Sequence, residues 1–354
     1  MARKGAWFET QGKTVGWAVV GLGMGRWHAR FIARSPHLDL VALCDANPKA
    51  LAAAGAEFPE ADRYGSIAEL LRDERVQGVS LVLPHNQHAA VAIRCMKAGR
   101  HVVLDKPFCL RVADGKRMID VAHETRRLLS VFHNRRWDAD FVAIRELVER
   151  GAIGKVRYLE SRISGPERFT GGIWRADKRQ MGGLLYDWPA HLIDQALLLV
   201  PSRPVDVTGL AQRDIPERKG HDIEDRMQAT IRFEDGAVAL VGWALASPAP
   251  MARFVIEGER GGIRSEEQVS SLDRPKGGSV DLYTANAAGK VRCRKVPLAK
   301  VDWSAYYRNV GAALTGKVEL IVLPEQALRH VAIAEAAYRS VRSGRAVALP
   351  AELF

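Results

Sequence analysis

The sequence predicts an α/β protein with two domains, the first built on a parallel β-sheet and the second on a largely antiparallel one. Two observations carry this prediction. Short apolar segments of strand character alternate with helical segments up to about residue 134, and beyond it strand segments mostly follow one another. Alternating strands and helices form βαβ units with parallel strands, whereas successive strands joined by turns pair antiparallel. A length of 354 residues is also typical of about two domains.

The first domain is expected to contain strands over residues 15–20, 38–44, 79–83, 101–104 and 128–133, and helices over residues 27–34, 48–57, 67–72, 87–98 and 112–126. Pro48 suits a first helical turn, because an N–H there would have no partner within the helix. Ser66 and Glu69 have the spacing of a capping box, and Gly99 suits the position just after a helix end.

The second domain is expected to contain helices over residues 141–149, 182–200, 303–314 and 324–343, and strands over residues 156–163, 205–210, 227–233, 237–244, 254–257 and 280–283. Asp235-Gly236 predicts a hairpin turn between two of these strands. A sheet that packs helices on one face must cover its other apolar surface. We therefore expect a homodimer or a homotetramer.

Composition excludes several classes of protein. The net charge of +11 comes from scattered basic residues, which favours a basic surface that attracts an anionic cofactor over nucleic-acid binding. No apolar segment approaches the roughly 18 residues of a membrane span, and the N-terminus lacks the features of a signal peptide. The four cysteines form neither a Cys-x-x-Cys pair nor a cluster with histidines, which predicts reduced thiols, no metal site and a cytoplasmic location.

The first motif is the turn Gly21-Leu22-Gly23-Met24-Gly25, which follows an apolar strand and precedes a helix. Such a turn lets a pyrophosphate approach the backbone at a helix N-terminus, although the last glycine comes one residue earlier than in G-x-G-x-x-G. Asp45 ends the second strand, where a carboxylate accepts hydrogen bonds from ribose hydroxyls and repels a 2′-phosphate. The alternative to ribose binding is that Asp45 only caps a turn. Because Lys49 could reach a 2′-phosphate, NADP also remains open as the cofactor.

Two further motifs end strands of the same sheet, where ligands of open α/β sheets bind. The first runs from Pro84 to His88, and His88 is either a ligand contact or an ordinary helix-start residue. The second is Asp105-Lys106-Pro107, whose lysine is either a proton relay beside a cationic nicotinamide or an exposed surface lysine.

A fourth motif places Asp187, His191 and Asp194 in an apolar segment. Asp187 and His191 share a helix face if the helix already runs through Pro189. Buried polar groups need partners, and histidine is well suited to take a hydroxyl proton near neutral pH. A buried hydrogen-bonded pair is the structural alternative, and metal binding is a weaker one.

Polar and aromatic residues also gather at two places outside these motifs. Trp174 could stack on the apolar face of a sugar ring, and Asn134 and Arg136 could reach the nicotinamide or the substrate. Surface salt bridges are the alternative for the arginines.

Together these motifs resemble the Gfo/Idh/MocA family of oxidoreductases over essentially the whole chain. The resemblance also includes Tyr306-Tyr307, Pro324-Glu325-Gln326-Ala327 and Ser343-Gly344-Arg345-Ala346-Val347. It implies a doubly wound NAD(P)-binding Rossmann domain over residues 1–135. A substrate-binding and oligomerisation domain of α/β class, with a large, mostly antiparallel sheet, would then span residues 136–354.

The resemblance further implies hydride transfer between NAD, or less favourably NADP, and a hydroxyl or carbonyl of a sugar, cyclitol or glycoside. It makes His191 the general base, Lys106 a residue that orients substrate or assists proton transfer, and Asp187 a ligand of a substrate hydroxyl. The residues predicted to bind the cofactor are Gly21, Leu22, Gly23, Met24, Gly25, Asp45, Pro84, His88, Asp105, Lys106 and Asn134. Those predicted to bind substrate are Arg136, Trp174, Asp187 and His191.

The chain departs from the family pattern at three positions. Asp105 stands where the family usually has a glutamate, and Pro189 stands where a glycine is common. His85 stands where the family usually has an asparagine. Three other functions remain open: an NADP-dependent carbonyl reductase, a cofactor-recycling enzyme for epimerisation, elimination or glycoside cleavage, and a non-catalytic NAD(P)-binding sensor. Retention of Lys106, Asp187 and His191 together argues against the sensor.

Overall fold

Segments from both ends of the chain build the first of two structural units. The computed structural model describes residues 7–10, 12–165, 174–213, 222–245, 247, 249, 251–266, 278–286, 288–298 and 300–354. The first unit comprises Met1–His133 and Trp303–Leu328, and the second comprises Asn134–Asp302 and Arg329–Phe354. The segment Trp303–Leu328 therefore groups with the first unit, whereas the sequence analysis placed it in the second domain.

The first unit contains a six-stranded parallel sheet in the order β3-β2-β1-β4-β5-β6. Its strands are β1 (Val15–Val20), β2 (Leu38–Cys44), β3 (Asp62–Tyr64), β4 (Gly78–Leu81), β5 (His101–Leu104) and β6 (Leu129–Val131). The chain leaves β1 toward β2 on one side and later returns to β4 on the other side. The carboxyl ends of β1 and β4 therefore form the switch point at which such sheets bind ligands.

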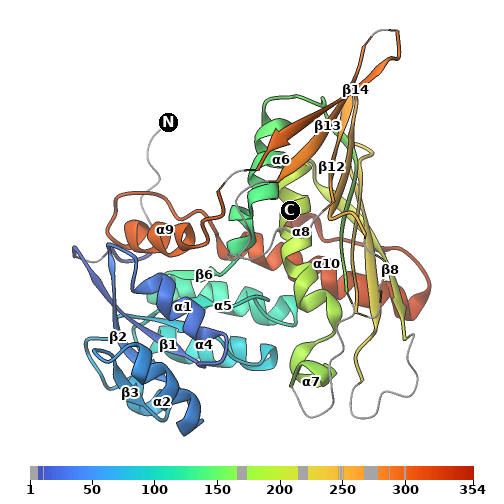
Figure 1. Ribbon diagram of the computed structural model, residues 1–354. Coiled ribbons are helices and arrows are strands. Elements are labelled where there is room, and N and C mark those ends of the chain that lie inside the picture. Colours follow the sequence, from blue (N-terminus) through green and yellow to red (C-terminus); the bar gives the residue numbers. More distant parts are fainter. Residues whose placement is uncertain are drawn as a thin grey trace. The chain divides into compact units, whose positions relative to one another are not determined.

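The helices of the first unit are α1 (Gly25–Ile32), α2 (Pro48–Glu57), α3 (Ile67–Leu70), α4 (His88–Lys97), α5 (Val112–Thr125) and α9 (Ser304–Leu314). Helices α4 and α5 pack against each other, and α9 packs against α1 (Figure 1). The predicted capping residues are confirmed. Pro48 lies in the first turn of α2, the Ser66 hydroxyl accepts from the Glu69 amide at 3.2 Å, and Gly99 has φ +81°.

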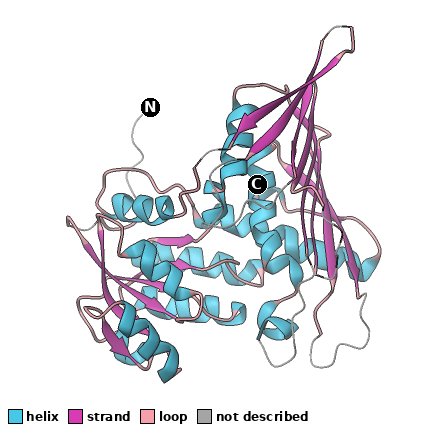
Figure 2. Cartoon of the chain, viewed as in Figure 1, coloured by secondary structure: helices cyan, strands magenta, loops and turns pink. Residues whose placement is uncertain are grey.

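The second unit contains a nine-stranded sheet in the order β14-β13-β12-β11-β7-β10-β9-β8-β15. Its strands are β7 (Val156–Ser164), β8 (Pro204–Gln212), β9 (Arg226–Phe233), β10 (Val238–Ala244), β11 (Phe254–Gly258), β12 (Gly261–Ser265), β13 (Ser279–Ala285), β14 (Val291–Pro297) and β15 (Val347–Ala348). Among the described strands of this sheet, only β7 and β10 pair in parallel, and β13 and β14 form a long hairpin (Figure 2). The prediction of a mostly antiparallel sheet is confirmed.

The helices of the second unit are α6 (Ala139–Glu149), α7 (Lys178–Met181), α8 (Trp188–Leu199) and most of α10 (Pro324–Ser343). Helix α8 packs on β7 and β10, and α6 packs on α8. The helix predicted over residues 182–200 starts only at Trp188, because Gly182 and Gly183 have φ of +90° and +120°, Leu184–Tyr186 form a 3-10 turn and Asp187 is non-helical. No helix in the described part of the chain combines the length and apolarity needed to cross a membrane.

Candidate active site

The three glycines of the turn after β1 have three different environments. Gly21 has φ +86°, and a Cβ there would lie 2.1 Å from the Val82 carbonyl oxygen. A Cβ on Gly25 would lie 3.0 Å from Val19 Cγ1, so this glycine lets α1 pack closely on the sheet. A Cβ on Gly23 would meet nothing within 4 Å. Gly23 therefore leaves open the space that a pyrophosphate needs beside the N-terminus of α1, and the turn fits a dinucleotide.

Asp45 is fixed beside this turn. Its Oδ2 accepts from the Leu22 amide at 2.7 Å, and its Oδ1 accepts from the Asn47 amide at 2.8 Å. These contacts agree with the turn-cap interpretation. They do not exhaust the acceptor capacity of a half-buried carboxylate, which offers about four lone-pair sites. The remaining sites suit the hydroxyls of a ribose.

The Asp105-Lys106-Pro107 turn follows β5 and is held by a buried histidine. His88 begins α4 and has no exposed surface. Its Nδ1 lies 2.8 Å from the Pro107 carbonyl oxygen, and its Nε2 lies 3.0 Å from the Leu83 carbonyl oxygen. Burial lowers the pKa of His88, whereas the Pro107 and Leu83 carbonyls that its two ring nitrogens face favour the protonated ring. His88 is thus the helix-start residue that the sequence offered as the alternative to a ligand contact, and both of its ring nitrogens face backbone carbonyls.

Asp105 keeps its charge within this turn. Burial alone would raise the pKa of its carboxyl group, but His28, then Lys106 and His88, hold that pKa well below its usual range. Lys106 itself is half-buried, as is Pro84 at the end of the neighbouring strand. The structure thus brings Asp105, Lys106 and His88 together at one strand end, as the sequence motifs predicted.

In the second unit, His191 lies in α8, which includes Pro189, whereas Asp187 is the residue just before the helix and has a non-helical backbone, with φ -101° and ψ -109°. Each is 5% exposed. Asp187 Oδ2 lies 3.4 Å from Nε of Arg175, and this guanidinium stacks on the Trp174 ring at 4.4 Å. Arg175 thereby links the residue predicted to stack on a sugar to the residue predicted to bind a substrate hydroxyl.

The loop before Asp187 is fixed by a buried carboxylate. Glu224 forms an ion pair with Lys178, and its Oε2 accepts from the Leu184 amide at 3.3 Å and from the Tyr338 hydroxyl at 3.1 Å. A Cβ on Gly183 would lie 2.1 Å from that hydroxyl, so only glycine fits this close approach. These contacts set where α8 begins.

Helix α8 is anchored farther along by a buried ion pair. Nε and Nη2 of Arg136 donate to the two carboxylate oxygens of Asp194 at 2.7 and 2.6 Å, and both side chains are about 5% exposed. The next residue, Gln195, donates to the Arg135 carbonyl and accepts from Arg253. Arg136 thus has a structural partner that neither the substrate-contact nor the surface hypothesis anticipated. Asn134 lies nearby in sequence and is also buried.

One further residue escaped the sequence analysis. His28 lies on α1 with its Nε2 3.7 Å from Oδ1 of Asp105. The only available signal was a histidine three residues after the glycine turn, on a helix expected to be amphipathic. Periodicity treats such a residue as part of the core.

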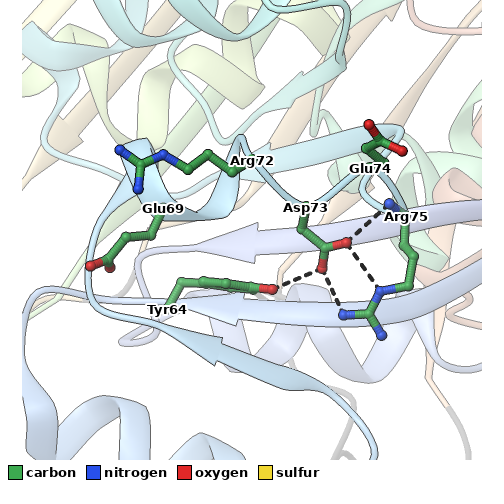
Figure 3. Close-up of a pocket in the computed structure, with 6 residues that line it drawn as sticks. All are labelled: Tyr64, Glu69, Arg72, Asp73, Glu74 and Arg75. Atoms are coloured by element: carbon green, nitrogen blue, oxygen red, sulfur yellow. Dashed lines mark hydrogen bonds and ion pairs between the residues drawn. The ribbon is translucent and has the colours of Figure 1, made fainter.

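A surface hollow of about 430 Å³ lies elsewhere on the first unit (Figure 3). It is lined by Tyr64, Glu69, Arg72, Asp73, Glu74 and Arg75. Asp73 accepts from the Tyr64 hydroxyl at 2.9 Å and pairs with Arg75 at 2.8 Å. Three of its six lining residues, Tyr64, Asp73 and Arg75, bind one another, and no predicted site residue contributes to the hollow.

Comparisons with known proteins agree with both units. Residues 15–133 match the family model "Oxidoreductase family, NAD-binding Rossmann fold", and residues 145–349 match "Oxidoreductase family, C-terminal alpha/beta domain". An uncharacterized oxidoreductase of Schizosaccharomyces pombe is 31% identical, with 94% of this chain and 98% of that protein covered. The scyllo-inositol 2-dehydrogenase (NADP(+)) of Bacillus subtilis is 27% identical over 83% of this chain and 84% of its own length.

A solved structure repeats the whole architecture. The NAD-binding protein from Listeria innocua superposes with a TM-score of 0.84 at 27% identity, covering 95% of this chain and 97% of that one. The Rossmann domain predicted from the glycine turn and Asp45 is thereby confirmed. The chain belongs to the Gfo/Idh/MocA family and is an oxidoreductase with an NAD-binding domain at its N-terminus.

Proposed function

We propose that this protein is a dehydrogenase that prefers NAD and oxidises a ring hydroxyl of a cyclitol, sugar or glycoside. One observation carries the proposal: Asp187 is the N-cap residue of α8, His191 follows within the first turns of that helix, and Arg175 joins the Asp187 carboxylate to Trp174. Oxidation of a ring hydroxyl needs a group that accepts the hydroxyl proton. An aromatic side chain can pack on the apolar face of the ring. The relative named scyllo-inositol 2-dehydrogenase supports the same class of substrate.

Each residue has a distinct role in this proposal. His191 removes the hydroxyl proton, and Asp187, with its charge balanced by Arg175, accepts a hydrogen bond from a substrate hydroxyl. Trp174 packs on the apolar face of the ring. Lys106 orients the substrate or assists proton transfer. Bound NAD⁺ supplies the acceptor for the hydride.

The choice of cofactor follows from the first unit. The turn from Gly21 to Gly25 would hold the pyrophosphate, and Asp45 would bind the adenosine ribose and repel a 2′-phosphate. The inositol dehydrogenase relative is named for NADP⁺, so the preference of this chain for NAD is to be measured directly.

The experiment is a spectrophotometric assay of nicotinamide reduction with NAD⁺ or NADP⁺ and a panel of inositols, aldoses and glycosides. We expect turnover with a cyclitol or sugar, and His191→Asn should lower kcat by roughly 100-fold or more, as loss of a general base does. His123→Asn is the matched control, because that histidine is 47% exposed and faces Glu325. Wild-type turnover by His191→Asn would refute the assignment.

Product formation without net reduction of NAD⁺ would instead identify a cofactor-recycling enzyme. Bound cofactor with no reaction across the panel would favour a sensor.

We also propose that the protein assembles as a homodimer or homotetramer through the nine-stranded sheet. Helices α6 and α8 pack on one face of this sheet, and alternate side chains of β9 and β10 point away from that face and are partly exposed.

A further inference from the structure

A chain of buried polar groups runs through the first unit and ends at Asp105. The indole Nε1 of Trp17 donates to Ser80 Oγ at 2.8 Å. Ser80 Oγ lies 2.7 Å from the Tyr307 hydroxyl, and this hydroxyl lies 2.7 Å from Nδ1 of His28. The opposite ring nitrogen of His28 lies 3.7 Å from Oδ1 of Asp105.

The first contact of this chain of polar groups has a fixed direction, because the indole of Trp17 can only donate and Ser80 Oγ therefore accepts there. The contact between Ser80 and Tyr307 allows either hydroxyl to donate, and the arrangement that serves His28 is the one in which Ser80 gives its own proton to Tyr307. Tyr307 then donates to Nδ1 of His28. An imidazole that accepts at Nδ1 carries its proton on Nε2, and that proton faces the Asp105 carboxylate.

Burial makes the arrangement rigid. Trp17, Ser80 and Tyr307 have no exposed surface, and His28 is 3% exposed. The His28 ring also packs on Phe132, with ring centroids 4.3 Å apart. A buried polar chain that lost one member would leave its neighbours without partners, so each member constrains the next. Asp105 is the member that reaches solvent, with 18% of its side chain exposed.

Two buried histidines therefore bracket Lys106. His28 faces the side chain of the preceding residue, and His88 lies against the carbonyl of the following one. We propose that His28, with Tyr307 behind it, is a positioning residue that sets the Asp105 carboxylate and thereby the place and reactivity of the Lys106 ammonium. This inference rests on the proposed function for the role of Lys106 in turnover.

Tyr307→Phe tests the proposal, because it removes one buried hydroxyl and keeps the ring. The matched control is Tyr306→Phe. This neighbouring tyrosine of α9 is almost as buried as Tyr307, but its hydroxyl donates to Ser130 at 2.8 Å and does not belong to the chain of polar groups that ends at Asp105. With the polyol panel, Tyr307→Phe should lower kcat by about tenfold, as loss of a positioning partner does, with KM changed less than about twofold. Tyr306→Phe should keep wild-type kcat.

A second measurement does not depend on turnover. Acetylation of Lys106 by acetic anhydride is followed by peptide mass spectrometry from pH 7 to 10, with exposed Lys49 as the internal reference. Release of the lysine turn in Tyr307→Phe should change the relative acetylation rate of Lys106 by about threefold or more, whereas Tyr306→Phe should match the wild type. If Tyr307→Phe does not fold, Ser80→Ala, which removes the preceding hydroxyl, takes its place.

The outcomes separate the two proposals. A wild-type protein that turns over no substrate of the panel would contradict the proposed function. The acetylation rates of Lys106 alone would then test whether His28 and Tyr307 position the lysine turn. Equal Lys106 acetylation in Tyr307→Phe and Tyr306→Phe overturns that role whatever the turnover.

Discussion

At the scale of single residues, Gly21 and Gly23 show how one turn separates folding from binding. Both are glycines of the same motif, yet a Cβ on Gly21 would overlap the backbone of Val82. Any residue at position 21 would also have to adopt a φ of +86°. A Cβ on Gly23 would enter open space. Gly21 is thus required by the fold itself, whereas Gly23 is required only when a dinucleotide lies against the turn.

This contrast makes a prediction about paired variants. Gly21→Ala should destabilise the protein by more than about 1 kcal/mol, because alanine at positive φ is strained. Gly23→Val should leave the free energy of unfolding within roughly 0.5 kcal/mol of the wild type. It should nevertheless weaken NAD⁺ binding at least about tenfold, which is about 1.4 kcal/mol. Urea unfolding and isothermal titration calorimetry provide the two measurements. Wild-type NAD⁺ affinity in Gly23→Val would mean that the pyrophosphate lies elsewhere.

At the scale of elements, α8 carries His191 and is held by contacts on both sides of that residue. Glu224 and Tyr338 fix the loop that precedes the helix, and the Arg136–Asp194 pair fixes its next turn. A bidentate pair with both partners about 95% buried is costly to break, because removing one partner leaves a buried charge.

We therefore expect Arg136→Met to destabilise the protein by about 3–5 kcal/mol. The double variant Arg136→Met/Asp194→Leu should recover most of that loss, since it leaves no charge unpaired. Arg111→Met is the control: Arg111 pairs with Asp114 at the surface with 73% of its side chain exposed, and such pairs contribute roughly 0–1 kcal/mol. Urea unfolding of the four proteins checks the order. A loss in Arg136→Met no larger than in Arg111→Met would show that the pair does not anchor α8.

The same helix shows how far the sequence could be interpreted. Spacing correctly placed His191 and Asp194 on one helix, because such motifs are local, although Asp187 precedes that helix as its N-cap residue. It could not identify Arg136 as the partner of Asp194, since the two are 58 positions apart and meet only in the folded chain. It also began this helix six residues too early, at Gly182, because the apolar residues Leu184–Tyr186 extend the apolar pattern although they form a separate 3-10 turn.

Strands were missed for a related reason. Strand β3 has only three residues, Asp62–Tyr64, and none is buried. Strand β14 is exposed along most of its length, and Gly261–Ser265 opens with two glycines. Hydrophobic alternation detects strands that bury one face, so short, exposed or glycine-led strands give little signal. The Rossmann strands were recognised because their burial is nearly continuous.

At the scale of the whole molecule, one face of the nine-stranded sheet carries apolar side chains that the described residues leave partly exposed. Leu210 on β8 is 51% exposed, and Leu240 and Val238 on β10 are partly exposed. Leu240 pairs with Thr230 on one side and Glu160 on the other, so apolar and polar side chains mix on this face. Mixed surfaces of this kind are typical of interfaces between copies of a protein.

The last prediction follows from that surface. Sedimentation equilibrium should give a mass of two or four times the 39.0 kDa of one chain. Leu240→Arg should shift the protein toward the single-chain mass, because a symmetric interface would bring at least two added charges into a dry contact. Val291→Arg is the control, since Val291 is 62% exposed on the hairpin strand β14, at the far edge of the sheet. A single-chain mass for the wild type, or equal masses for the wild type and Leu240→Arg, would place any contact between copies elsewhere.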